Sequence, residues 1–386
     1  MDSAEREGLR PKGNVPNLRF PEFEGEWEEE RLADIADLYK GTGISKDQLS
    51  DDGEPCILYG ELYTKYKSET IREVISKTNI DNTKLVRSKA NDVIIPCSGE
   101  TAEDIATARC VLNGNILLGG DLNIIRLHGY DGAFMSYQLN GKRKYDIAKV
   151  AQGVSVVHLY GEHLKGVKTI NPCLEEQKKI ASLLALLDER ISTQSKIIDK
   201  LQSLIKGIRN DVFGKLRKSV GFNAMISDVL SYEQPQPYIV ENTEYTAEGT
   251  PVLTANKAFV LGYTSETNGI YDKGDCIIFD DFTLDCKYVD FPYKIKSSAI
   301  KILTAKNKEI LRYTFEFLKY LDLSTDEHKR HYIAETQNQE FVLPTMQIVR
   351  TIAHAFSALS LRMESVVKQR NMFETQKQYL LRQMFI

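Results

Sequence analysis

The sequence predicts an α/β (α+β) protein with a two-fold internal repeat, in which each of two globular domains is followed by one long helix. Three observations support this fold class. The stretch 171–213 shares its pattern with the stretch 343–385. Both stretches carry apolar residues at the alternating spacings of four and three that are typical of coiled coils. The segments before them, 15–170 and 217–343, are instead rich in Tyr, Gly, Asn and short β-like runs.

The repeat has a constant offset. Pro172 and Pro344 stand 172 positions apart, and the same offset pairs Phe213 with Phe385 without a gap. Identity between the copies is low, but both begin with a proline, continue as a helical run of about 40 residues and stop at an aromatic residue. The shared pattern therefore indicates a duplicated unit.

The two globular segments are predicted to contain short strands and one helix each. The first segment should hold strands at 56–59, 93–95, 116–118, 124–127 and 154–159, and a helix at 133–139. The second should hold strands at 251–253, 276–279 and 299–303, and a helix at 310–321. Short sequence similarities indicate that the two segments share one arrangement of elements, since 32–35 resembles 226–229 and 91–95 resembles 274–278.

The two long helices carry an apolar seam that neither can bury alone, so we expect them to pack on each other or on partner helices. The second copy places Arg370 and Lys377 on its seam, which predicts looser or shifted pairing there. The first seam consists of Ile180, Leu184, Leu187, Ile191, Gln194, Ile198, Leu201, Ile205, Ile208 and Val212. The second consists of Ile352, Phe356, Leu359, Met363, Val366, Phe373, Leu380 and Met384.

Composition excludes several classes of protein. The chain has 386 residues and a net charge of −4, so it is not a histone-like polycation, although a local basic face remains possible for a folded domain. No apolar run reaches the roughly 18 residues of a membrane-spanning helix. The six cysteines form no C-x-x-C pair, which predicts free thiols in a reducing cytoplasm. We therefore expect a cytoplasmic protein.

Motifs of catalysis are absent from the sequence. It has no phosphate-binding loop, no G-x-S-x-G elbow and no H-E-x-x-H zinc site. His328 and His331 could share a helix face, but no further ligands complete a metal site, so none is predicted. One alternative stays open: Asp275, Asp285 and Lys287 loosely fit the carboxylate–lysine pattern of a metal-dependent nuclease.

Polar loops with small, aromatic and basic residues recur at the predicted strand ends. Such side chains read base edges or hold phosphates, whereas any single loop of this kind is more typical of a solvated turn. We expect base-edge contacts from residues such as Gln152, Gln236 and Asn256, and phosphate contacts from Lys142, Arg143 and Lys144. The full candidate set for DNA binding is Thr42, Ser45, Lys46, Lys65, Lys67, Ser98, Lys142, Arg143, Lys144, Gln152, Gln234, Gln236, Tyr238, Asn256, Lys257, Lys329 and Arg330.

From about residue 16 onward, the chain resembles the specificity subunit of type I restriction-modification enzymes. Residues 17–23 (NLRFPEF), with Trp27 and 32–35 (LADI), are similar to that family's typical start. Residues 120–124 (GDLNI) and 151–153 (AQG) resemble the later part of its first target-recognition domain, and 174–181 (LEEQKKIA) resembles the entrance to its spacer helix. The second half departs from the pattern, with 346–349 (MQIV) where Leu-x-Glu-Gln would stand.

The resemblance implies a domain plan and a function. An N-terminal extension (1–16) would precede a target-recognition domain (17–171), a spacer helix (172–215), a second target-recognition domain (216–343) and a second spacer helix (344–386). The spacers would form an antiparallel coiled coil, and each domain would read one half of a bipartite, asymmetric double-stranded DNA target.

The resemblance also implies partners. The chain itself would be non-catalytic, without a cofactor or metal and without membrane contact. It would assemble with two modification subunits, which use S-adenosylmethionine, and with restriction subunits, which use ATP and Mg²⁺. Apart from the nuclease, a coiled-coil adaptor that does not touch DNA is the remaining alternative.

Overall fold

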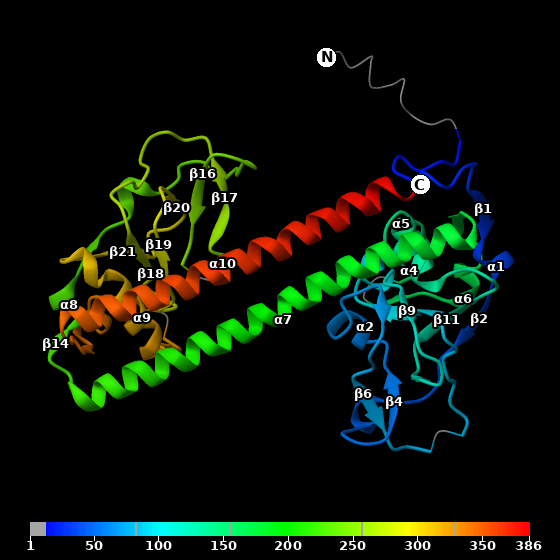
Figure 1. The fold of residues 1–386 in the computed structure, drawn as a ribbon, viewed down its shortest axis with the longest axis horizontal. Helices are drawn as coiled ribbons and strands as arrows, with labels where there is room; N and C mark the ends of the chain where they lie inside the picture. Colours follow the sequence, from blue (N-terminus) through cyan, green and yellow to red (C-terminus); the bar gives the residue numbers. More distant parts are fainter. Residues whose placement is uncertain (1–12, 82, 154–155, 256–257, 328) are drawn as a thin grey trace, which may run out of the picture. The chain divides into compact units, whose positions relative to one another are not determined.

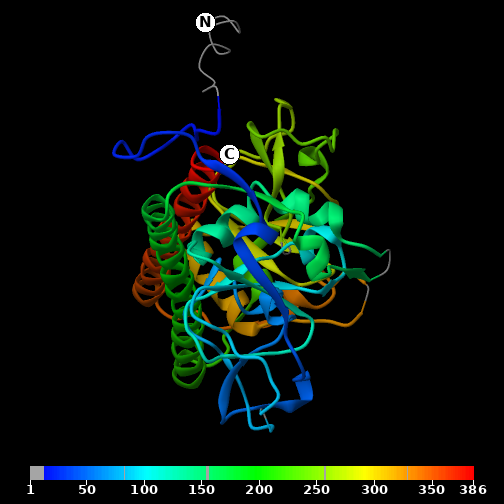
Figure 2. The same cartoon turned by 90° about the vertical axis from the view of Figure 1, so that its right-hand side faces the viewer.

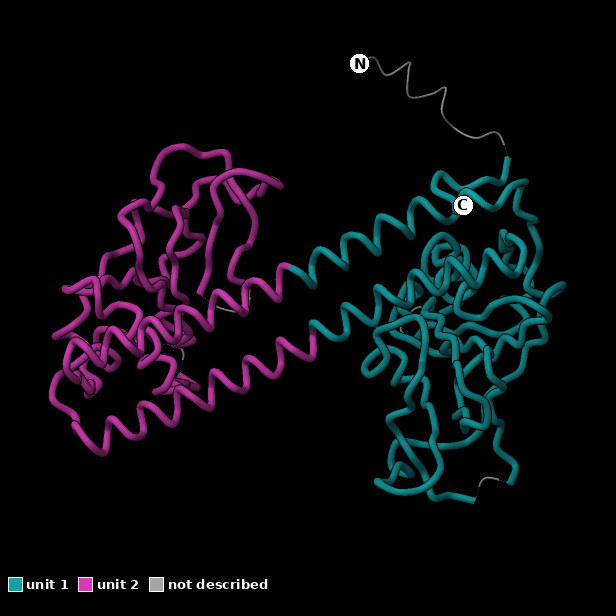
Figure 3. Tube along the Cα trace, viewed as in Figure 1, with its two compact units in different colours: residues 1–194, 369–386 teal, residues 195–368 magenta. Residues whose placement is uncertain are grey.

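The structure is a computed structural model that describes residues 13–81, 83–153, 156–255, 258–327 and 329–386. The chain divides into two compact units (Figure 3). Unit 1 comprises residues up to Gln194 together with Gln369–Ile386, and unit 2 comprises Ser195–Lys368. Each unit thus combines one α/β domain with parts of both long helices.

The main sheet of unit 1 has the strand order β2-β11-β7-β9-β5. Its centre is antiparallel and apolar, because Val93 pairs with Ile125, and Ile125 in turn pairs with Leu38 on the other side. Helix α4 covers one face, and its Phe134 packs in the same core as Trp27. The strands are β2 (Ala36–Lys40), β5 (Thr70–Ile71), β7 (Asp92–Pro96), β9 (Arg109–Val111) and β11 (Leu122–Leu127), and α4 is Gly132–Asn140.

The main sheet of unit 2 repeats this order as β15-β21-β18-β19. Ile277 pairs with Leu303, which pairs with Tyr232, so the central strands are again antiparallel and apolar. The predicted repeat is therefore confirmed at the level of topology. The elements are β15 (Leu230–Glu233), β18 (Cys276–Asp280), β19 (Cys286–Val289), β21 (Ile300–Ala305) and the covering helix α9 (Leu311–Leu321).

A smaller sheet accompanies each main sheet, with the order β10-β4-β6-β3 in unit 1 and β17-β16-β20 in unit 2. Both contain a parallel pair, β4 with β10 and β16 with β20. The strands are β3 (Leu49–Ser50), β4 (Glu54–Ile57), β6 (Ser76–Thr78), β10 (Leu117–Leu118), β16 (Thr250–Leu253), β17 (Val260–Thr264) and β20 (Lys294–Ile295).

A short strand pair leads into each long helix: β1 with β13 before α7, and β14 with β22 before α10. These elements are β1 (Glu28–Arg31), β13 (Lys168–Asn171), β14 (Ala224–Met225) and β22 (Glu340–Phe341). The remaining helices are α1 (Leu32–Ile35), α2 (Glu61–Thr64), α3 (Ala102–Ile105), α5 (Lys144–Val150), α6 (Gly161–Leu164) and α8 (Ile226–Val229). The small elements left are β8 (Ser98–Gly99), β12 (Val157–His158) and the 3-10 turns η3 (Lys46–Gln48), η4 (Gln236–Tyr238), η5 (Lys308–Ile310) and η6 (Thr336–Asn338).

The long helices are α7 (Leu174–Ser219) and α10 (Met346–Gln383). In unit 1 the first part of α7 lies beside the last part of α10 (Figures 1 and 2), and Leu184 shares a core with Met384. In unit 2 the last part of α7 meets the first part of α10, and Phe213 shares a core with Phe356. The two helices are therefore antiparallel within each unit.

The seam is buried or half-buried along its length. In the described structure, the buried members are Ile180, Leu184, Leu187, Ile198, Phe356, Val366, Leu380 and Met384, and the half-buried ones are Ile191, Gln194, Leu201, Ile205, Ile208, Val212, Ile352, Leu359, Met363 and Phe373. Lys377 does not loosen the seam as expected, because its ammonium is buried and paired with two carboxylates. None of the helices in the described ranges has the length and apolarity to cross a membrane.

Candidate nucleic-acid interface

In unit 1, two of the predicted residues meet around one histidine. Strand β8 pairs with β12 so that Ser98 stands opposite His158, and Ser98 Oγ lies 3.2 Å from His158 Nδ1. The backbone of Gln152 exchanges hydrogen bonds of 2.9 and 2.7 Å with that of His158. Because the pairing leaves the Gln152 side chain exposed, the cluster presents an amide, a hydroxyl and an imidazole together.

Aromatic and further imidazole groups extend this cluster. Tyr160 is 51% exposed, and its ring lies 6.1 Å from the His158 ring and 5.5 Å from the His163 ring. Gln152 Nε2 lies 3.5 Å from His163 Nε2. The sequence analysis missed His158, Tyr160 and His163, although an exposed tyrosine between two histidines is a signal that could have been found. We refer to Ser98, Gln152, His158, Tyr160 and His163 as the unit 1 polar cluster.

The glycine-rich turn at residues 41–43 packs against a second glycine pair, Gly119 and Gly120. Gly120 N donates to Gly43 O at 2.6 Å, and Thr42 N donates to Leu118 O at 3.2 Å. A Cβ on Gly41 would lie 2.0 Å from the carbonyl oxygen of Gly119, so this crossing requires glycine. The turn positions Thr42, whose hydroxyl accepts from Val86 N, as an exposed residue at the end of β2.

Unit 2 carries a different polar cluster at the corresponding edge of its main sheet. Gln234 follows β15, and its Oε1 accepts a 3.0 Å hydrogen bond from Lys301 Nζ. Lys301 is 1% exposed, lies 3.6 Å from Asp281 Oδ2 and sits 5.9 Å from the Tyr232 ring. Gln234, Tyr232, Lys301 and Asp281 form the unit 2 polar cluster, of which the sequence analysis had selected only Gln234.

Asp281 anchors the loop that carries two predicted basic residues. Its Oδ1 accepts from the backbone N–H groups of His331 at 3.0 Å and Tyr332 at 2.8 Å. This anchoring holds Lys329 and Arg330 beside the cluster, with the Arg330 guanidinium 5.9 Å from the Phe282 ring. The buried carboxylate of Asp281 therefore fixes the backbone of the loop, and the side chains of Lys329 and Arg330 remain exposed.

The charges in this loop are locally compensated. Lys329 Nζ lies 2.5 Å from Glu327 and 2.9 Å from Glu335, and these carboxylates raise its pKa. His331 Nδ1 lies 2.9 Å from Glu335 Oε2, and this hydrogen bond raises the pKa of His331. A phosphate held by Lys329 would have to compete with the two glutamates.

Three further predicted residues also have intramolecular partners in the structure. Lys65 Nζ bonds to Glu61 and Ser76 at 2.6 and 2.7 Å. Arg143 is half-buried at the start of α5 and donates to the carbonyl oxygen of Ile386 at 3.3 Å. Tyr238 is buried, and its hydroxyl donates to Glu233 at 2.6 Å. The partner of Arg143 lies 243 positions away and no local pattern reveals it, whereas Glu61 and Glu233 lie only four and five positions from Lys65 and Tyr238.

The other predicted residues have more open positions. Ser45 caps η3 through Gln48, and Lys67 Nζ donates to the carbonyl oxygen of Tyr63 at 2.8 Å. The positions Asn256 and Lys257, together with His328 and the first two residues of the strand predicted at 154–159, lie outside the described residues. Exposed side chains are Ser45, Lys46, Lys67, Lys142 and Gln236, and Lys144 is half-exposed.

The structure places the two carboxylates of the nuclease alternative, Asp275 and Asp285, far apart. Strand β18 pairs with β19 from Cys276↔Val289 to Phe279↔Cys286, so Asp275 and Asp285 lie at opposite ends of the hairpin. At 3.3 Å per residue they are about 17 Å apart, too far to share a metal ion. Asp285 is also paired: burial opposes its charge, but Lys319 Nζ at 2.9 Å outweighs this and lowers the pKa of the carboxyl. In the described ranges, no three His, Cys, Asp or Glu side chains could hold a metal ion.

Comparison with known proteins finds a family model that matches part of the chain. Residues 24–203 match the family model "Type I restriction modification DNA specificity domain". The chain is therefore similar to this family of type I restriction-modification specificity proteins over residues 24–203.

Particular relatives agree with this assignment. The chain is 43% identical over 126 residues to the type I restriction enzyme EcoR124I/EcoR124II specificity subunit of Escherichia coli, covering 31% of this chain and 31% of that protein. It is 28% identical over 199 residues to the MjaVIII specificity subunit of Methanocaldococcus jannaschii, covering 51% and 44%. The matches thus span less than half the length of these relatives.

A comparison of folds covers nearly the whole chain. The crystal structure of a type I restriction-modification system S subunit from M. genitalium matches with a TM-score of 0.69 and 17% identity, covering 96% of this chain and 99% of that one. The resemblance stated from the sequence is therefore confirmed for the family and the fold.

Proposed function

We propose that this chain is the non-catalytic DNA-recognition subunit of a type I restriction-modification complex, and that it reads a bipartite, asymmetric target. The observation that carries the proposal is the duplicated sheet with two different polar clusters. The orders β2-β11-β7-β9 and β15-β21-β18-β19 correspond, yet one edge carries Gln152 with two histidines and the other carries Gln234 with Lys301. Two domains that share one sheet topology but present different polar side chains would read different half-sites.

The residue roles follow from exposure. Gln152 and Gln236 are exposed amides, which can bond adenine bidentately, and Tyr160 offers an exposed ring for apolar contact. Lys46, Lys67, Lys142 and Lys144 would neutralise phosphates. Lys65, Arg143 and Tyr238 are better assigned to stabilising the fold of their own units, because their polar groups already have partners there.

The proposal includes the partners that the family resemblance implies. The chain would scaffold two modification subunits using S-adenosylmethionine and restriction subunits using ATP and Mg²⁺, in the cytoplasm. The domains 17–171 and 216–343 would each read one half-site, and the helices between them would set the unread gap. The relatives' names support such an assembly, since they are described as specificity subunits of restriction enzymes.

The test is a domain exchange read by methylome sequencing. Cells would express the chain with its modification subunit, and residues 220–343, which follow the end of α7 at Ser219, would be replaced by the same domain of a relative. We expect one half of the methylated motif to change while the other half is retained. The reciprocal exchange of residues 24–171 should change the opposite half. A change in both halves from one exchange, or no sequence-specific DNA binding by the methylase, would contradict the proposal.

A further inference from the structure

Each unit is built from both halves of the duplicated chain. Unit 1 takes Gln369–Ile386 from the second copy of the repeat, and unit 2 takes the part of α7 from Ser195 onward from the first copy. We call residues 1–221 half-chain 1 and residues 222–386 half-chain 2, since the linker 220–223 between α7 and β14 separates the copies. Each unit therefore contains an interface between the half-chains, and the residues that cross it decide which half-chains fit together.

The constant offset of the repeat identifies equivalent positions in the two interfaces. In unit 2, Phe213 shares a core with Phe356. The residues 172 positions away, Phe385 and Leu184, share a core in unit 1. The offset found in the sequence is therefore also the offset of the packing. As far as the apolar residues are concerned, two copies of one half-chain offer each other the same kind of surface as two different half-chains.

The polar residues at the two interfaces are not equivalent. In unit 1, Lys377 Nζ of half-chain 2 lies 2.6 Å from a carboxylate oxygen of both Asp188 and Glu69 of half-chain 1, and these side chains are between 9% and 12% exposed. The position equivalent to Lys377 in half-chain 1 is Ile205, and the position equivalent to Asp188 in half-chain 2 is Ser360. In unit 2 these two uncharged residues line a cavity of about 430 Å³. The ion pair of unit 1 thus has no counterpart at the same place in unit 2.

Unit 2 has a different ionic contact across its interface. Arg209 of half-chain 1 donates to Glu316 Oε2 of half-chain 2, through Nε at 3.0 Å and through Nη2 at 2.7 Å. Glu316 is buried, and Arg312 of its own half-chain donates to its other oxygen at 2.8 Å. The position equivalent to Arg209 in half-chain 2 is Leu381, which packs against the apolar core of unit 1. Half-chain 2 therefore has no guanidinium to supply at this position to a second copy of itself.

Pairing of identical half-chains would leave buried charges without their partners. In a pair of two half-chains 1, Ile205 would stand beside the two buried carboxylates, and Arg209 would enter the apolar core in the place of Leu381. In a pair of two half-chains 2, Glu316 would lose both hydrogen bonds from Arg209. Removing one partner of a buried ion pair is strongly unfavourable, because the remaining charge stays out of water without compensation.

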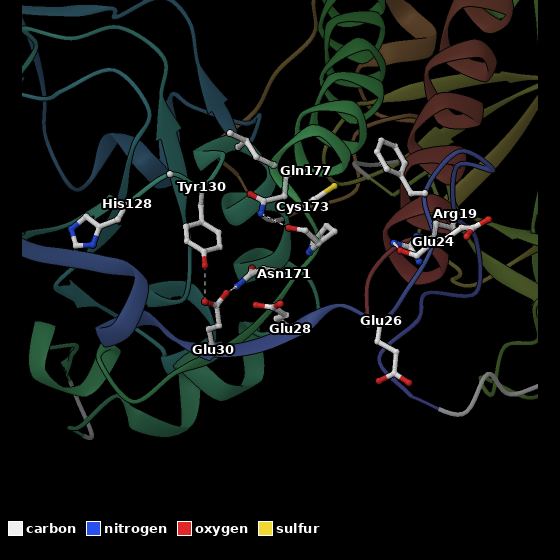
Figure 4. A pocket seen from close by; sticks show the side chains of 14 residues that line it. Arg19, Glu24, Glu26, Glu28, Glu30, His128, Tyr130, Asn171, Cys173 and Gln177 are labelled. Carbon is white, nitrogen blue, oxygen red and sulfur yellow. Dashed lines mark hydrogen bonds between the residues drawn. The ribbon is translucent and has the colours of Figure 1, made fainter.

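Contacts inside one half-chain do not discriminate between partners. Arg109 interacts with the same two carboxylates, but its Nε donates to the carbonyl oxygen of Tyr66 at 3.2 Å. Glu30 accepts hydrogen bonds from Tyr130 at 2.6 Å and from Asn171 at 3.0 Å (Figure 4). All of these residues belong to half-chain 1, so their contacts are the same whichever half-chain binds. The choice of partner depends instead on the charged side chains that cross the interface.

We propose that half-chain 1 binds half-chain 2 in preference to a second copy of itself, and that half-chain 2 does the same. Lys377 with its two carboxylates makes this choice in unit 1, and Arg209 with Glu316 makes it in unit 2. Specificity of this kind arises from the charges that a wrong partner leaves unpaired as much as from those that the right partner satisfies. Although the repeat makes the two halves alike in fold, a free half-chain would therefore select its complement.

The test starts from the folded full chain. A protease site inserted after Gly221, in the linker beyond α7, would be cleaved in the purified protein. Equal amounts of cleaved chain with and without a heavy-nitrogen label would be unfolded in urea, refolded and weighed by native mass spectrometry. Pairs of labelled with unlabelled half-chains show that partners have exchanged, and the unequal lengths of the half-chains give each kind of pair its own mass. We expect mixed pairs of half-chain 1 with half-chain 2 to exceed either pair of identical half-chains by at least about tenfold, whereas unselective pairing gives only about a twofold excess.

A variant that gains a partner tests the cause. Ile205→Lys gives half-chain 1 an ammonium at the position equivalent to Lys377, so two copies can satisfy each other's buried carboxylates. The matched control is Ile205→Gln, which disturbs the core of unit 2 at the same site but supplies no cation. In the cleaved chain, Ile205→Lys should raise the share of paired half-chains 1 by about fivefold or more over Ile205→Gln. Because formation of a new pair requires folded half-chains, misfolding cannot imitate this result.

Three results would overturn the proposal. The first is a set of pairs in the proportions of unselective pairing, and the second is the failure of the refolded half-chains to form any pair. The third is an equal share of paired half-chains 1 in Ile205→Lys and Ile205→Gln. The measurements use neither DNA nor methylation, so failure here is distinct from failure of the proposed function.

Discussion

Lys377 Nζ lies 2.6 Å from Asp188 Oδ1, and this ion pair joins the last part of α10 to the first part of α7 inside unit 1. The same ammonium lies 2.6 Å from Glu69, and Tyr137 OH donates to Asp188 Oδ2 at 2.7 Å. Lys377 is only 9% exposed. A buried charge at a seam position stabilises one register of the helices, because any slip would separate it from its partners.

We expect Lys377→Met to destabilise unit 1 by about 3–5 kcal/mol, since it leaves the carboxylates of Asp188 and Glu69 buried without a cation. Urea unfolding followed by tryptophan fluorescence measures this, because the single tryptophan, Trp27, lies in the core of unit 1. Lys368→Met, at an exposed position of the same helix, is the control. If both variants lost the same free energy of unfolding, the ion pair of Lys377 with Asp188 and Glu69 would make no specific contribution to the stability of unit 1.

The pairing of His331 with Glu335 predicts a pH dependence in unit 2. The hydrogen bond raises the pKa of His331 above its ordinary value of 6.5. The stabilisation is therefore complete below pH 6.5 and is lost as the pH rises through the raised pKa. Hydrogen exchange of β18 and β21 should show that His331→Gln loses protection at pH 5.5 and much less at pH 8.5. His354→Gln, on the exposed face of α10, should show no such trend. A constant difference across this range would contradict the assignment.

Gln152 and Lys142 should differ in what they contribute to DNA binding. Gln152→Ala removes an exposed amide from the unit 1 polar cluster, so it should cost about 1–3 kcal/mol at one base position and relax specificity there. Lys142→Ala should weaken binding on all sequences and lower the slope of log affinity against log salt by about one. Affinity of the assembled methylase across single-base target variants and salt concentrations measures both. A uniform effect of Gln152→Ala would remove it from the set of base contacts.

A paired heptad insertion tests whether the helices act as a ruler. Seven residues that continue the seam would be added after Ser195 in α7 and after Lys368 in α10. Each helix gains roughly 10 Å, which corresponds to about three base pairs. The methylated motif should keep both half-sequences and gain a longer central gap. An active methylase with an unchanged gap would refute this.

The sequence predicted the elements that depend on long or strongly apolar patterns. The heptads of α7 and α10 and the apolar strands β7, β11 and β18 were found because many residues contribute to each pattern. Short elements such as β5 and β13 were missed, since two to four residues carry almost no periodic signal.

Residues whose role depends on distant partners could not be assigned from the sequence. Lys377 was expected to disturb the seam because its partner Glu69 lies 308 positions away in the chain. Arg143 was assigned to phosphate binding, yet its guanidinium contacts Ile386, 243 positions away. His158 was not recognised because its partner Ser98 reaches it only through the β8–β12 pairing. Local chemistry was visible in each case, but the three-dimensional partner was not.

Residues 369–386 complete the core of unit 1, where Phe385 stacks on Phe134 at 5.1 Å between ring centroids. The ribosome must therefore make residues 195–368 before it makes the segment that closes the first unit. At about 5–20 residues per second, this interval lasts on the order of ten to thirty seconds. During that time Ile180, Leu184 and Leu187 lack the residues of α10 that cover them. Unit 2 has both of its helical segments first, so its sequence is complete before that of unit 1, although unit 1 begins earlier in the chain.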